Sequence, residues 1–566
     1  MQAAMTKLPA DALFLGFDSS TQSLKATAID AGLRLHSFQS VHFDSELPHY
    51  GTKDGVHRDP KVQGRITGPV LMWVEALELV LSKLTKAGFP FEKVYGVSGS
   101  GQQHGSVYWA KDAQEYHLKK LNPLKSLLVQ FQGAFSVQDS PVWMDSSTSL
   151  QCRAIEKAMG GALSLTELTG SRAYERFTGP QIRKLFETQT ETYNSTERIS
   201  LVSSFMASLL VGEYVAIDHS DGAGMNLMDI RHRTWSPEAL EATAPGLEEK
   251  LGPLAAPHAV AGNLSTYFVE RFKFRKECVV IHWSGDNPCS LAGLALNQPG
   301  DLAISLGTSD TVFGVTKDLH PGLEGHVFPN PVDPESYMAM LCYKNGSLTR
   351  EEIRDRCANG SWKTFGDLLE KTLPYNGGKM GFYYKDFEIL PPLPAGTRRF
   401  VVQQHDGNNF ISGEVKQVSK FDPPTEVRAV VEGQFLSMRA HTERIGMPCP
   451  PERILVTGGG STNPHLLTLM ASIFGCPVYT AQRPDSASLG AALRAAHGWI
   501  CNRTGEFVPI ALMFSNAAED SAIQCHLRAA AGPSHLHDGY GQLASVRAKL
   551  EQQLLDEAMH KNLCSN

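Results

Sequence analysis

The stretch LFLGFDSSTQSLKATAID, residues 13 to 30, is built on the same plan as DLAISLGTSDTVFGV, residues 301 to 315. Each is an apolar run, a short turn rich in hydroxyl side chains, and a second apolar run. That pattern is typical of a β-hairpin. When the two stretches are laid on each other, Asp18 faces Gly307. Two similar hairpins, each near the start of about half of the chain, predict two duplicated domains that face one another.

The order of strands and helices predicts the fold class. Three short runs in the second half, CVVIHWS, RILVTGG and PVYTA, are typical of buried strands, and two of them lead directly into glycine-containing turns and helical patterns. Strands that alternate with helices indicate an α/β architecture. At 566 residues the chain is too long for one hydrophobic core, so we expect two large domains or more.

Composition excludes several classes of protein. The hydrophobic fraction of 42% and the charged fraction of 20% are ordinary for a globular protein, and a net charge of −7 gives no reason to expect nucleic acid as a partner. We find no continuous apolar segment near the roughly 20 residues that cross a bilayer. The opening MQAAMTKLPADA is too short for a signal or transit peptide and carries an acid. We therefore expect a cytosolic protein without a membrane partner. The ten cysteines form no CxxC pair, so we expect free thiols.

A glycine-rich turn follows the strand in ILVTGGGSTNPHLLTLMASIFG, residues 454 to 475. Asn463 directly before Pro464 is the pairing expected of a helix N-cap and the first helical position. Glycines without Cβ let a ligand lie against the backbone, and the free amides at a helix start favour an anion. A tight strand-to-helix turn without a ligand is an equally good interpretation of this stretch alone. The GxxxxGKS order is absent, which excludes an ordinary Walker-type phosphate loop.

The stretch VVIHWSGDNPCSLAGLAL, residues 279 to 296, predicts a strand up to Ser284-Gly285 and a helix that begins at Pro288. Asn287, adjacent to the proline, is the better-placed N-cap. Asp286 is then left at a strand end without a structural role, where its carboxylate could accept a proton from a substrate hydroxyl. The alternative is an N-terminal acid favoured by the helix dipole, and on this motif alone it is the better interpretation.

Polar side chains gather in three further loops. GSGQQHGSVYW places Gln102, Gln103 and His104 in a glycine-bounded turn, whose amide and imidazole groups suit the recognition of hydroxyls. SPVWMDSSTSLQ and GSRAYERFTG set Asp145 and Arg176 beside aromatic residues, although loops of this kind are most often solvated. Two hydroxyl-rich turns, a glycine-rich helix start and an acid at a strand end are together the parts that a nucleotide-dependent phosphotransferase requires.

Six segments, in this order, resemble the FGGY carbohydrate kinases, and within that family the eukaryotic xylulose kinases in their plant form: GFDSSTQSLKA, GVSGSGQQHGSVYW, WSGDNPCSLAG, SLGTSDTVF, VTGGGSTNPHL and RPDSASLGAALRAAHGW. The resemblance implies an α/β fold of two actin-like (ribonuclease H-like) domains around a central catalytic cleft. It implies a sugar-binding domain over residues 12–295, a nucleotide-binding domain over 296–505 and an extension of unknown role over 506–566. The implied reaction is transfer of the γ-phosphoryl group of ATP to the 5-hydroxyl of D-xylulose.

The resemblance also implies roles for particular residues. Asp286 matches the general base of the family. The sugar-contacting positions are Gln103, His104, Arg176, Asp286 and Asn287. The nucleotide positions are Gly307, Thr308 and Ser309 in the second hairpin turn, Trp362, and Gly458, Gly459, Gly460 and Asn463 in the adenine seat. Asp145 receives no catalytic role, because many bacterial relatives carry an arginine two residues after that acid and this chain has Ser147.

The first hairpin raises a problem of charge. A carboxylate placed against a triphosphate repels it, so a mediating cation is the natural resolution, namely Mg²⁺ held loosely by Asp18 and the phosphates. Ser19, Ser20 and Thr21, with Lys25 nearby, would then serve the anion. The alternative for Asp18 is a turn-forming residue without a ligand.

Two rival functions stay open at this point. One is another FGGY kinase, acting on ribulose, glycerol or 1-deoxy-xylulose, because hydroxyl stereochemistry cannot be read from one chain. The other is an actin-like ATPase without a sugar acceptor. Gln103, His104, Arg176 and Asp286 argue against that ATPase, since a polyol site needs such groups and a motor has no evident use for them. The expected partners are a small sugar and MgATP, and residues 110–140, which read as a surface insertion, receive no function.

Overall fold

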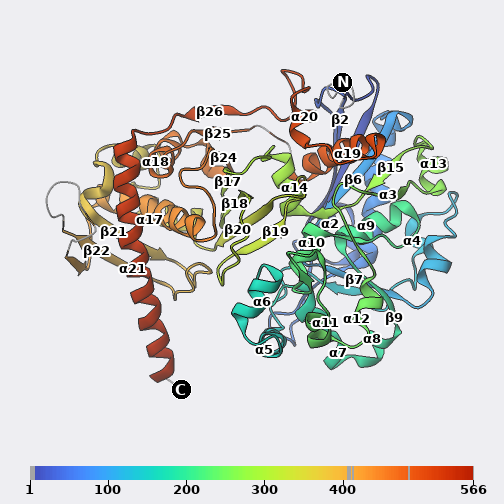
Figure 1. Cartoon of the computed structure of the whole chain (residues 1–566), viewed down its shortest axis with the longest axis horizontal. Coiled ribbons are helices and arrows are strands. Elements are labelled where there is room, and N and C mark those ends of the chain that lie inside the picture. Colours follow the sequence, from blue (N-terminus) through green and yellow to red (C-terminus); the bar gives the residue numbers. More distant parts are fainter. Residues whose placement is uncertain (1–6, 404–409, 411–413, 482, 484, 565–566) are drawn as a thin grey trace.

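The computed structural model describes residues 7–403, 410, 414–481, 483 and 485–564. They form two lobes, each built around a seven-stranded mixed sheet (Figure 1). The first sheet has the order β14 (Val260–Asn263), β15 (Val279–Ile281), β6 (Val94–Gly101), β1 (Leu13–Ser19), β2 (Ser23–Asp30) and β3 (Leu35–His42), and β16 (Ser284–Gly285) also pairs with β6. The second has the order β19 (His326–Pro329), β20 (Tyr337–Tyr343), β18 (Asp310–Thr316), β17 (Asp301–Leu306), β24 (Arg453–Thr457), β25 (Val478–Thr480) and β26 (His526–Ala529).

The two sheets repeat one topology, which confirms the predicted duplication. In the first, the β1–β2 hairpin continues antiparallel to β3 on one side and parallel to β6 and β15 on the other, with β14 antiparallel at the edge. In the second, the β17–β18 hairpin continues antiparallel to β20 on one side and parallel to β24 and β25 on the other, with β26 antiparallel at the edge of that side. The edge strand β19 is an addition of the second sheet. The α/β, actin-like architecture expected from the sequence is therefore the observed one.

The overlay of the two hairpins predicted from the sequence is wrong by two residues. Strands β1 and β17 end at Ser19 and Leu306, so Asp18 matches Ser305, and both lie inside strands rather than in turns. Gly307 is the first residue of its turn and has no relation to the acid. Because aspartate is a common turn residue, the sequence pattern favoured a turn, whereas Asp18 pairs through its backbone with strands on both sides.

The last quarter of the chain serves both sheets. Helix α19 (Ser486–Thr504) packs on β1 and β6 of the first sheet and on α14 (Asp286–Gly293), where Gly490 comes so close that a Cβ would lie 1.7 Å from the carbonyl oxygen of Cys289. The final segment adds β26 to the second sheet, and α21 (Ser534–Cys564) packs on α17 (Pro423–Arg444) and α18 (Pro464–Phe474). Figure 1 shows α21 running along the second lobe.

The segment 110–140 is irregular but is more than a surface insertion. It contains two short helical turns, η3 (Gln114–Leu118) and α4 (Leu127–Gln130), and its Phe131 and Phe135 are buried against Trp109 at centroid distances of 6.2 and 5.1 Å. The segment therefore contributes to the core of the first lobe. The prediction rested on its polar residues and overlooked these two aromatic anchors.

Two further expectations concern the whole chain. Within the residues that the structure describes, no helix is both long enough and apolar enough to cross a membrane. The nine cysteines of the described part whose side chains are placed are all free thiols, as expected.

Candidate active site

Asp286 begins helix α14 directly after strand β16. The N-cap is Gly285, with φ −69° and ψ 160°, so the predicted helix start at Pro288 with Asn287 as cap is wrong. The extended strand turns into the helix without the intervening loop residues that the prediction assumed. The Oδ1 atom of Asp286 accepts a hydrogen bond from the backbone N–H of Asn287 at 2.9 Å. The acid thus does have a place in the helix start.

The electrostatic surroundings of Asp286 suit a proton acceptor. Burial raises the pKa of this carboxyl to about 7, the charge of Asp18 raises it further in the same sense, and hydrogen bonds from the backbone N–H groups of Asn287 and Gln103 oppose the rise. When the pKa of a group lies near the working pH, a large fraction of the group is deprotonated, and the deprotonated form is still basic enough to accept a proton from a hydroxyl.

Two amides lie beside this acid. The Nδ2 group of Asn287 donates to Oε1 of Gln103 at 2.8 Å and is 3.2 Å from Oδ1 of Asp286. The Nε2 atom of Gln103 and the Oε1 atom of Gln102 are buried and have no hydrogen-bond partner among the described residues. Buried polar atoms rarely stay unpaired, so this turn presents a donor and an acceptor that a hydroxyl-bearing ligand could satisfy.

His104 adds a neutral imidazole to the same turn. Its backbone has φ +69°, which is uncommon for a residue with a Cβ, and its Nδ1 lies 2.8 Å from the carbonyl oxygen of Gly224. The ring stacks on Phe177 at 4.2 Å. Burial and the nearby Arg176 lower the pKa of His104 to about 3. The ring is therefore neutral, Nδ1–H donates to the carbonyl, and Nε2 is an acceptor.

Arg176 lies over aromatic rings and reaches a residue of the other lobe. Its guanidinium carbon is 4.7 Å from the ring centroid of Tyr174 and 5.5 Å from that of Phe177. Its Nη2 lies 2.6 Å from Nε2 of His326, on β19 of the second sheet. Within the described part of the chain Arg176 forms no ion pair. No sequence pattern points to His326, because the contact joins residues 150 positions apart.

Asp18 is buried and already has two polar neighbours. The hydroxyl of Ser100 donates to its Oδ1 at 2.7 Å, and Nζ of Lys25 lies 3.3 Å from its Oδ2. Burial raises the pKa of Asp18, the charge of Asp485 raises it further, and Lys25 and Ser100 act against the rise. Lys25, expected to serve an anion beside the turn, instead pairs with these two acids, at 2.6 Å in the case of Asp485.

The donors at this end of the first sheet fit a hard divalent cation. Asp18 and Asp286 supply carboxylate oxygens close enough that the charge of one raises the pKa of the other. The hydroxyl of Ser19 is buried and unpartnered among the described residues. Oxygen ligands of this kind suit Mg²⁺, which keeps several waters and needs few protein ligands.

A second group of possible ligands, Glu324, His441 and Glu551, lies in the other lobe. There the guanidinium of Arg444 is 3.0 Å from a carboxylate oxygen of each acid, and Nε2 of His441 lies 2.8 Å from Glu551. Arg444 already supplies the positive charge that a metal would bring.

The second lobe holds a cavity of about 630 Å³ at the end of β17. It is lined by six residues predicted for the nucleotide, namely Gly307, Thr308, Trp362, Gly459, Gly460 and Asn463. Asn463 caps α18 as predicted, and its side chain accepts from the backbone N–H groups of His465 and Leu466. A Cβ on Gly459 would meet nothing within 4 Å, so its backbone is open to a ligand. The predicted residues Ser309 and Gly458 do not line the cavity, and Ser19, Ser20 and Thr21 lie on the first lobe.

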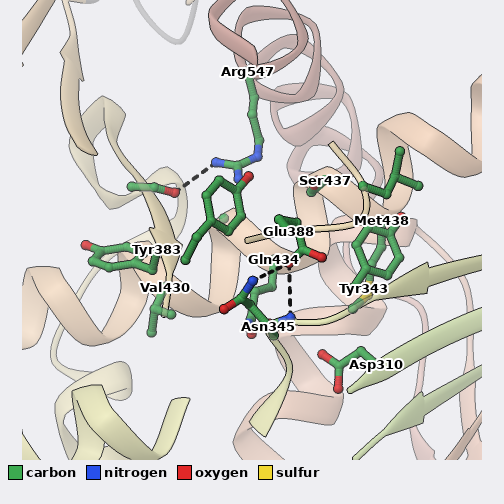
Figure 2. A pocket seen from close by; sticks show the side chains of 14 residues that line it. Asp310, Tyr343, Asn345, Tyr383, Glu388, Val430, Gln434, Ser437, Met438 and Arg547 are labelled. Carbon is green, nitrogen blue, oxygen red and sulfur yellow. Dashed lines mark hydrogen bonds between the residues drawn. The ribbon is translucent and has the colours of Figure 1, made fainter. Parts of the chain in front are cut away.

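A buried ion pair lies next to the turn that contains Gly307. The Nη1 and Nη2 atoms of Arg350 lie 2.6 and 3.0 Å from the carboxylate of Asp310, and both side chains are about 1% exposed. Gln434 accepts from Arg350 and donates to the carbonyl oxygens of Asn345 and Gly346. Figure 2 shows Asp310, Asn345 and Gln434 around a small pocket, into which Arg547 of α21 reaches from the opposite side. A residue of the C-terminal segment thus lines the same small pocket as Asp310 and Gln434.

Residues outside the first hairpin also contact its turn. The indole Nε1–H of Trp143 donates to Oγ1 of Thr21 at 2.8 Å, and Gly55 approaches Thr21 so closely that a Cβ would lie 1.9 Å from its carbonyl oxygen. Asp145 accepts from the backbone N–H of Ile66 and from the side chain of Gln181. Its carboxylate has a structural use.

Comparison with known proteins assigns both lobes to one family. Residues 136–293 match the N-terminal domain, and residues 302–499 the C-terminal domain, of the FGGY family of carbohydrate kinases. The chain is 63% identical to xylulose kinase 2 of Arabidopsis thaliana over 553 residues, covering 98% of this chain and 99% of that one. It is 47% identical to the mouse xylulose kinase over 545 residues, covering 96% and 95%. Among solved structures it is similar to kinases from Brucella ovis and Rhodospirillum rubrum titled as xylulose kinases, with TM-scores of 0.74 and 0.75 at 20% and 16% identity, each match covering 96% of this chain and 99% of the other.

Proposed function

The chain belongs to the FGGY family of carbohydrate kinases, and we propose that it transfers the γ-phosphoryl group of ATP to the 5-hydroxyl of D-xylulose, giving D-xylulose 5-phosphate. Relatives named xylulose kinase match nearly the whole chain, from a plant at 63% identity and from a mammal at 47%. The structural observation that carries the proposal is the carboxyl of Asp286, with a pKa raised to about 7, at one end of the first sheet beside the unpartnered amide atoms of Gln102 and Gln103.

Asp286 acts as the general base in this proposal. Its carboxylate accepts the proton of the attacking hydroxyl as the bond to phosphorus forms. The hydrogen bond from Asn287 N–H to Oδ1 fixes the direction of the carboxylate. Asn287 and Gln103, which bond each other, and Nε2 of His104 orient the remaining hydroxyls of the sugar. Arg176, a cation without an acidic partner in the described chain, donates to sugar oxygens.

The nucleotide occupies the cavity of the second lobe. Trp362, Gly460 and the open backbone of Gly459 receive the adenine part. The turn of Gly307, Thr308 and Ser309 offers N–H groups and hydroxyls to the phosphates. Gly458 shapes the start of this loop, and Asn463 fixes the helix that follows. On the first lobe, Ser19, Ser20 and Thr21 serve the phosphates from the opposite side.

Asp18 is the residue proposed to hold Mg²⁺, which when bound would neutralise part of the charge of the phosphates. The chain's own contribution here is to place two carboxylates, Asp18 and Asp286, where substrate phosphates arrive. Lys25 limits the negative charge of Asp18 and Asp485 until the substrates bind.

Closure of the cleft between the lobes would exclude water, which otherwise competes with the sugar for the γ-phosphoryl group. The division into residues 12–295, 296–505 and 506–566 and a cytosolic location belong to the same proposal. Support for the division comes from the two sheets, with the qualification that α19 packs on the first and that β26 and α21 belong to the second.

An assay of ADP release over a panel of ketoses and polyols tests the proposed function. We expect the highest kcat/KM with D-xylulose, and very little ATP turnover without sugar. A clear preference for ribulose, glycerol or 1-deoxy-xylulose would keep the family and change the substrate. Rapid ATP turnover that no sugar stimulates would favour an actin-like ATPase and contradict the proposal.

A further inference from the structure

The second lobe touches the proposed sugar site through one edge strand. The backbone N–H of Val327, in β19, donates to the carbonyl oxygen of Gly170 of the first lobe at 3.0 Å. Gly170 has φ +87°, and a Cβ there would lie 2.3 Å from the carbonyl oxygen of Val327. All four residues of β19 are buried although the strand is at the edge of its sheet. Figure 1 shows β19 at the boundary of the two lobes, next to α10 (His219–Gly222).

His326, the first residue of β19, bonds to the first lobe with both ring nitrogens. Its Nε2 lies 2.6 Å from Nη2 of Arg176, and its Nδ1 lies 2.8 Å from the hydroxyl of Ser171. A guanidinium can only donate, so Nε2 is the acceptor and Nδ1 carries the proton that is donated to Ser171. Burial, together with the positive charge of Arg176 and the neighbouring His104, lowers the pKa of His326 well below its usual value, in agreement with a neutral ring.

Aromatic contacts connect His326 to the other sugar-site imidazole. The His326 ring lies 4.8 Å from Tyr174 at an interplanar angle of 72° and 5.2 Å from Phe177 at 39°. Phe177 stacks in turn on His104 at 4.2 Å. Arg176 lies over the same two aromatic rings. His326 is 4% exposed, so bulk water does not compete for its nitrogens.

We propose that His326 is a positioning residue for the sugar site: it fixes the guanidinium of Arg176, so that the affinity of the first lobe for sugar depends on an edge strand of the second. The inference rests on the proposed contact of Arg176 with the sugar. Without this acceptor, the four rotatable side-chain bonds of the arginine would have to be ordered by the sugar itself, at a cost in affinity. Any displacement of β19 from Gly170 would have the same effect, and by linkage a bound sugar would hold β19 in place.

Three single variants test whether His326 acts by positioning Arg176 or only by packing against its neighbours. His326→Phe keeps a ring between Tyr174 and Phe177 and removes the acceptor, whereas His326→Gln offers an amide oxygen near the place of Nε2. Arg176→Met removes the positioned group. We expect His326→Phe to raise the sugar Kd, measured by calorimetry without nucleotide, and the sugar KM by roughly 10-fold to 100-fold, the range for a hydrogen bond to a charged group. His326→Gln should recover most of this loss, and the KM for ATP should change by less than about 3-fold.

The double variant Arg176→Met with His326→Phe decides whether the histidine acts through the arginine. If it does, His326→Phe has no further effect on the sugar Kd once Arg176 is gone. His497→Asn is the matched control, because His497 is also buried and its Nε2 bonds to the carbonyl oxygen of Val508 and the thiol of Cys501, outside the sugar site. We expect it to leave the sugar Kd unchanged. Thermal melting of every variant accompanies the binding data.

Three results would overturn the inference. An unchanged sugar Kd in His326→Phe, with a large loss in Arg176→Met, would remove His326 from the site and leave the proposed function standing. Additive losses in the double variant would show that His326 affects sugar binding independently of Arg176, and would also leave the proposed function standing. If the wild-type chain binds and phosphorylates no sugar, the proposed function fails, and the inference fails with it.

Discussion

The ammonium group of Lys25 lies 2.6 Å from a carboxylate oxygen of Asp485, a residue 460 positions further along the chain. The pair connects strand β2 of the first sheet to the residue that caps α19, since Oδ1 of Asp485 accepts from the backbone N–H of Ser488. The same ammonium is 3.3 Å from Asp18. One lysine therefore balances the buried Asp18 and the partly buried Asp485, and so links the first sheet to a late segment of the chain.

Lys25→Met should destabilise the protein by about 1–3 kcal/mol at neutral pH, because a buried and a partly buried carboxylate lose their counter-ion. Burial alone would raise the pKa of Asp485, but Lys25 outweighs it and the pKa is lowered, while the two acids raise the pKa of Lys25 despite its burial. The stabilisation by the Lys25–Asp485 pair is therefore present above pH 3.8, is lost as the pH falls below that value, and is lost again above pH 10.5. Melting temperatures of both proteins from pH 3 to pH 9, with exposed Lys86→Met as control, test this. A constant difference over the acid range would contradict the ion-pair explanation.

Asp286→Asn should reduce turnover by roughly 10²-fold to 10⁴-fold, the range for removal of an acid–base group. Asparagine keeps the shape and can still occupy the first position of α14, so the sugar Kd should change little. Turnover of the wild-type chain should fall as the pH drops below about 7, where Asp286 is protonated. Steady-state kinetics from pH 5 to pH 9 provide the measurement. Near-normal turnover in the variant would remove Asp286 from the role of base.

The same substitution should stabilise the fold. A carboxyl with a folded pKa of about 7 and an unfolded value of 3.8 binds protons more tightly in the folded state, so the wild-type chain loses stability as the pH rises from 4 to 7. Asparagine carries no such loss. We expect Asp286→Asn to be more stable by about 1–3 kcal/mol at pH 8, with the difference vanishing near pH 4. Thermal melting at the two pH values measures it, and a variant that is less stable at pH 8 would show that the acid contributes to the helix start.

Local patterns predicted the elements that local physics controls. The alternation around residues 13–30 and 301–315 gave both hairpins, and the order Asn463-Pro464 gave the cap of α18, because both depend on neighbours in the chain. The exact overlay of the hairpins and the start of α14 depend on where a strand stops pairing, which the sequence of one strand does not contain.

The contacts that the sequence could not supply are tertiary. His326 has no motif around it and reaches Arg176 only because an extra edge strand was added to the second sheet. Lys25 follows the first hairpin turn closely in the sequence, so it was expected to bind phosphate. In the structure, α19 packs on the first sheet and brings Asp485 against Lys25. The sequence was sufficient to predict that the two halves are similar. It was not sufficient to predict the features that make them differ, namely β19 and the packing of α19 on the first sheet.

Asp18→Ala should weaken Mg²⁺-dependent turnover far more than sugar binding. The proposed ligand for the cation is lost, so the Mg²⁺ concentration for half-maximal activity should rise by about tenfold or more, while the sugar Kd stays within about threefold. Because the charge of Asp18 raises the pKa of Asp286, the acid limb of the pH–turnover curve should also move to lower pH. Asp30→Ala, at the half-buried far end of strand β2 in the same hairpin, is the control. Equal losses in turnover and sugar binding would return Asp18 to a structural role.

Gly458 and Gly459 are adjacent, but a side chain would clash with the backbone at Gly458 and would meet open space at Gly459, so the two positions form a matched pair for mutation. Gly458 has φ +78°, and a Cβ would lie 2.6 Å from the carbonyl oxygen of Leu306, whereas a Cβ on Gly459 meets nothing within 4 Å and points into the nucleotide cavity. Gly458→Ala should therefore lower the melting temperature, by an amount equivalent to about 1–2 kcal/mol or more. Gly459→Val should keep the melting temperature of the free protein and raise the KM for ATP by about tenfold or more, since the side chain takes space that the ligand needs. If Gly459→Val left the KM for ATP unchanged while sugar phosphorylation continued, the nucleotide would have to lie elsewhere than in this cavity.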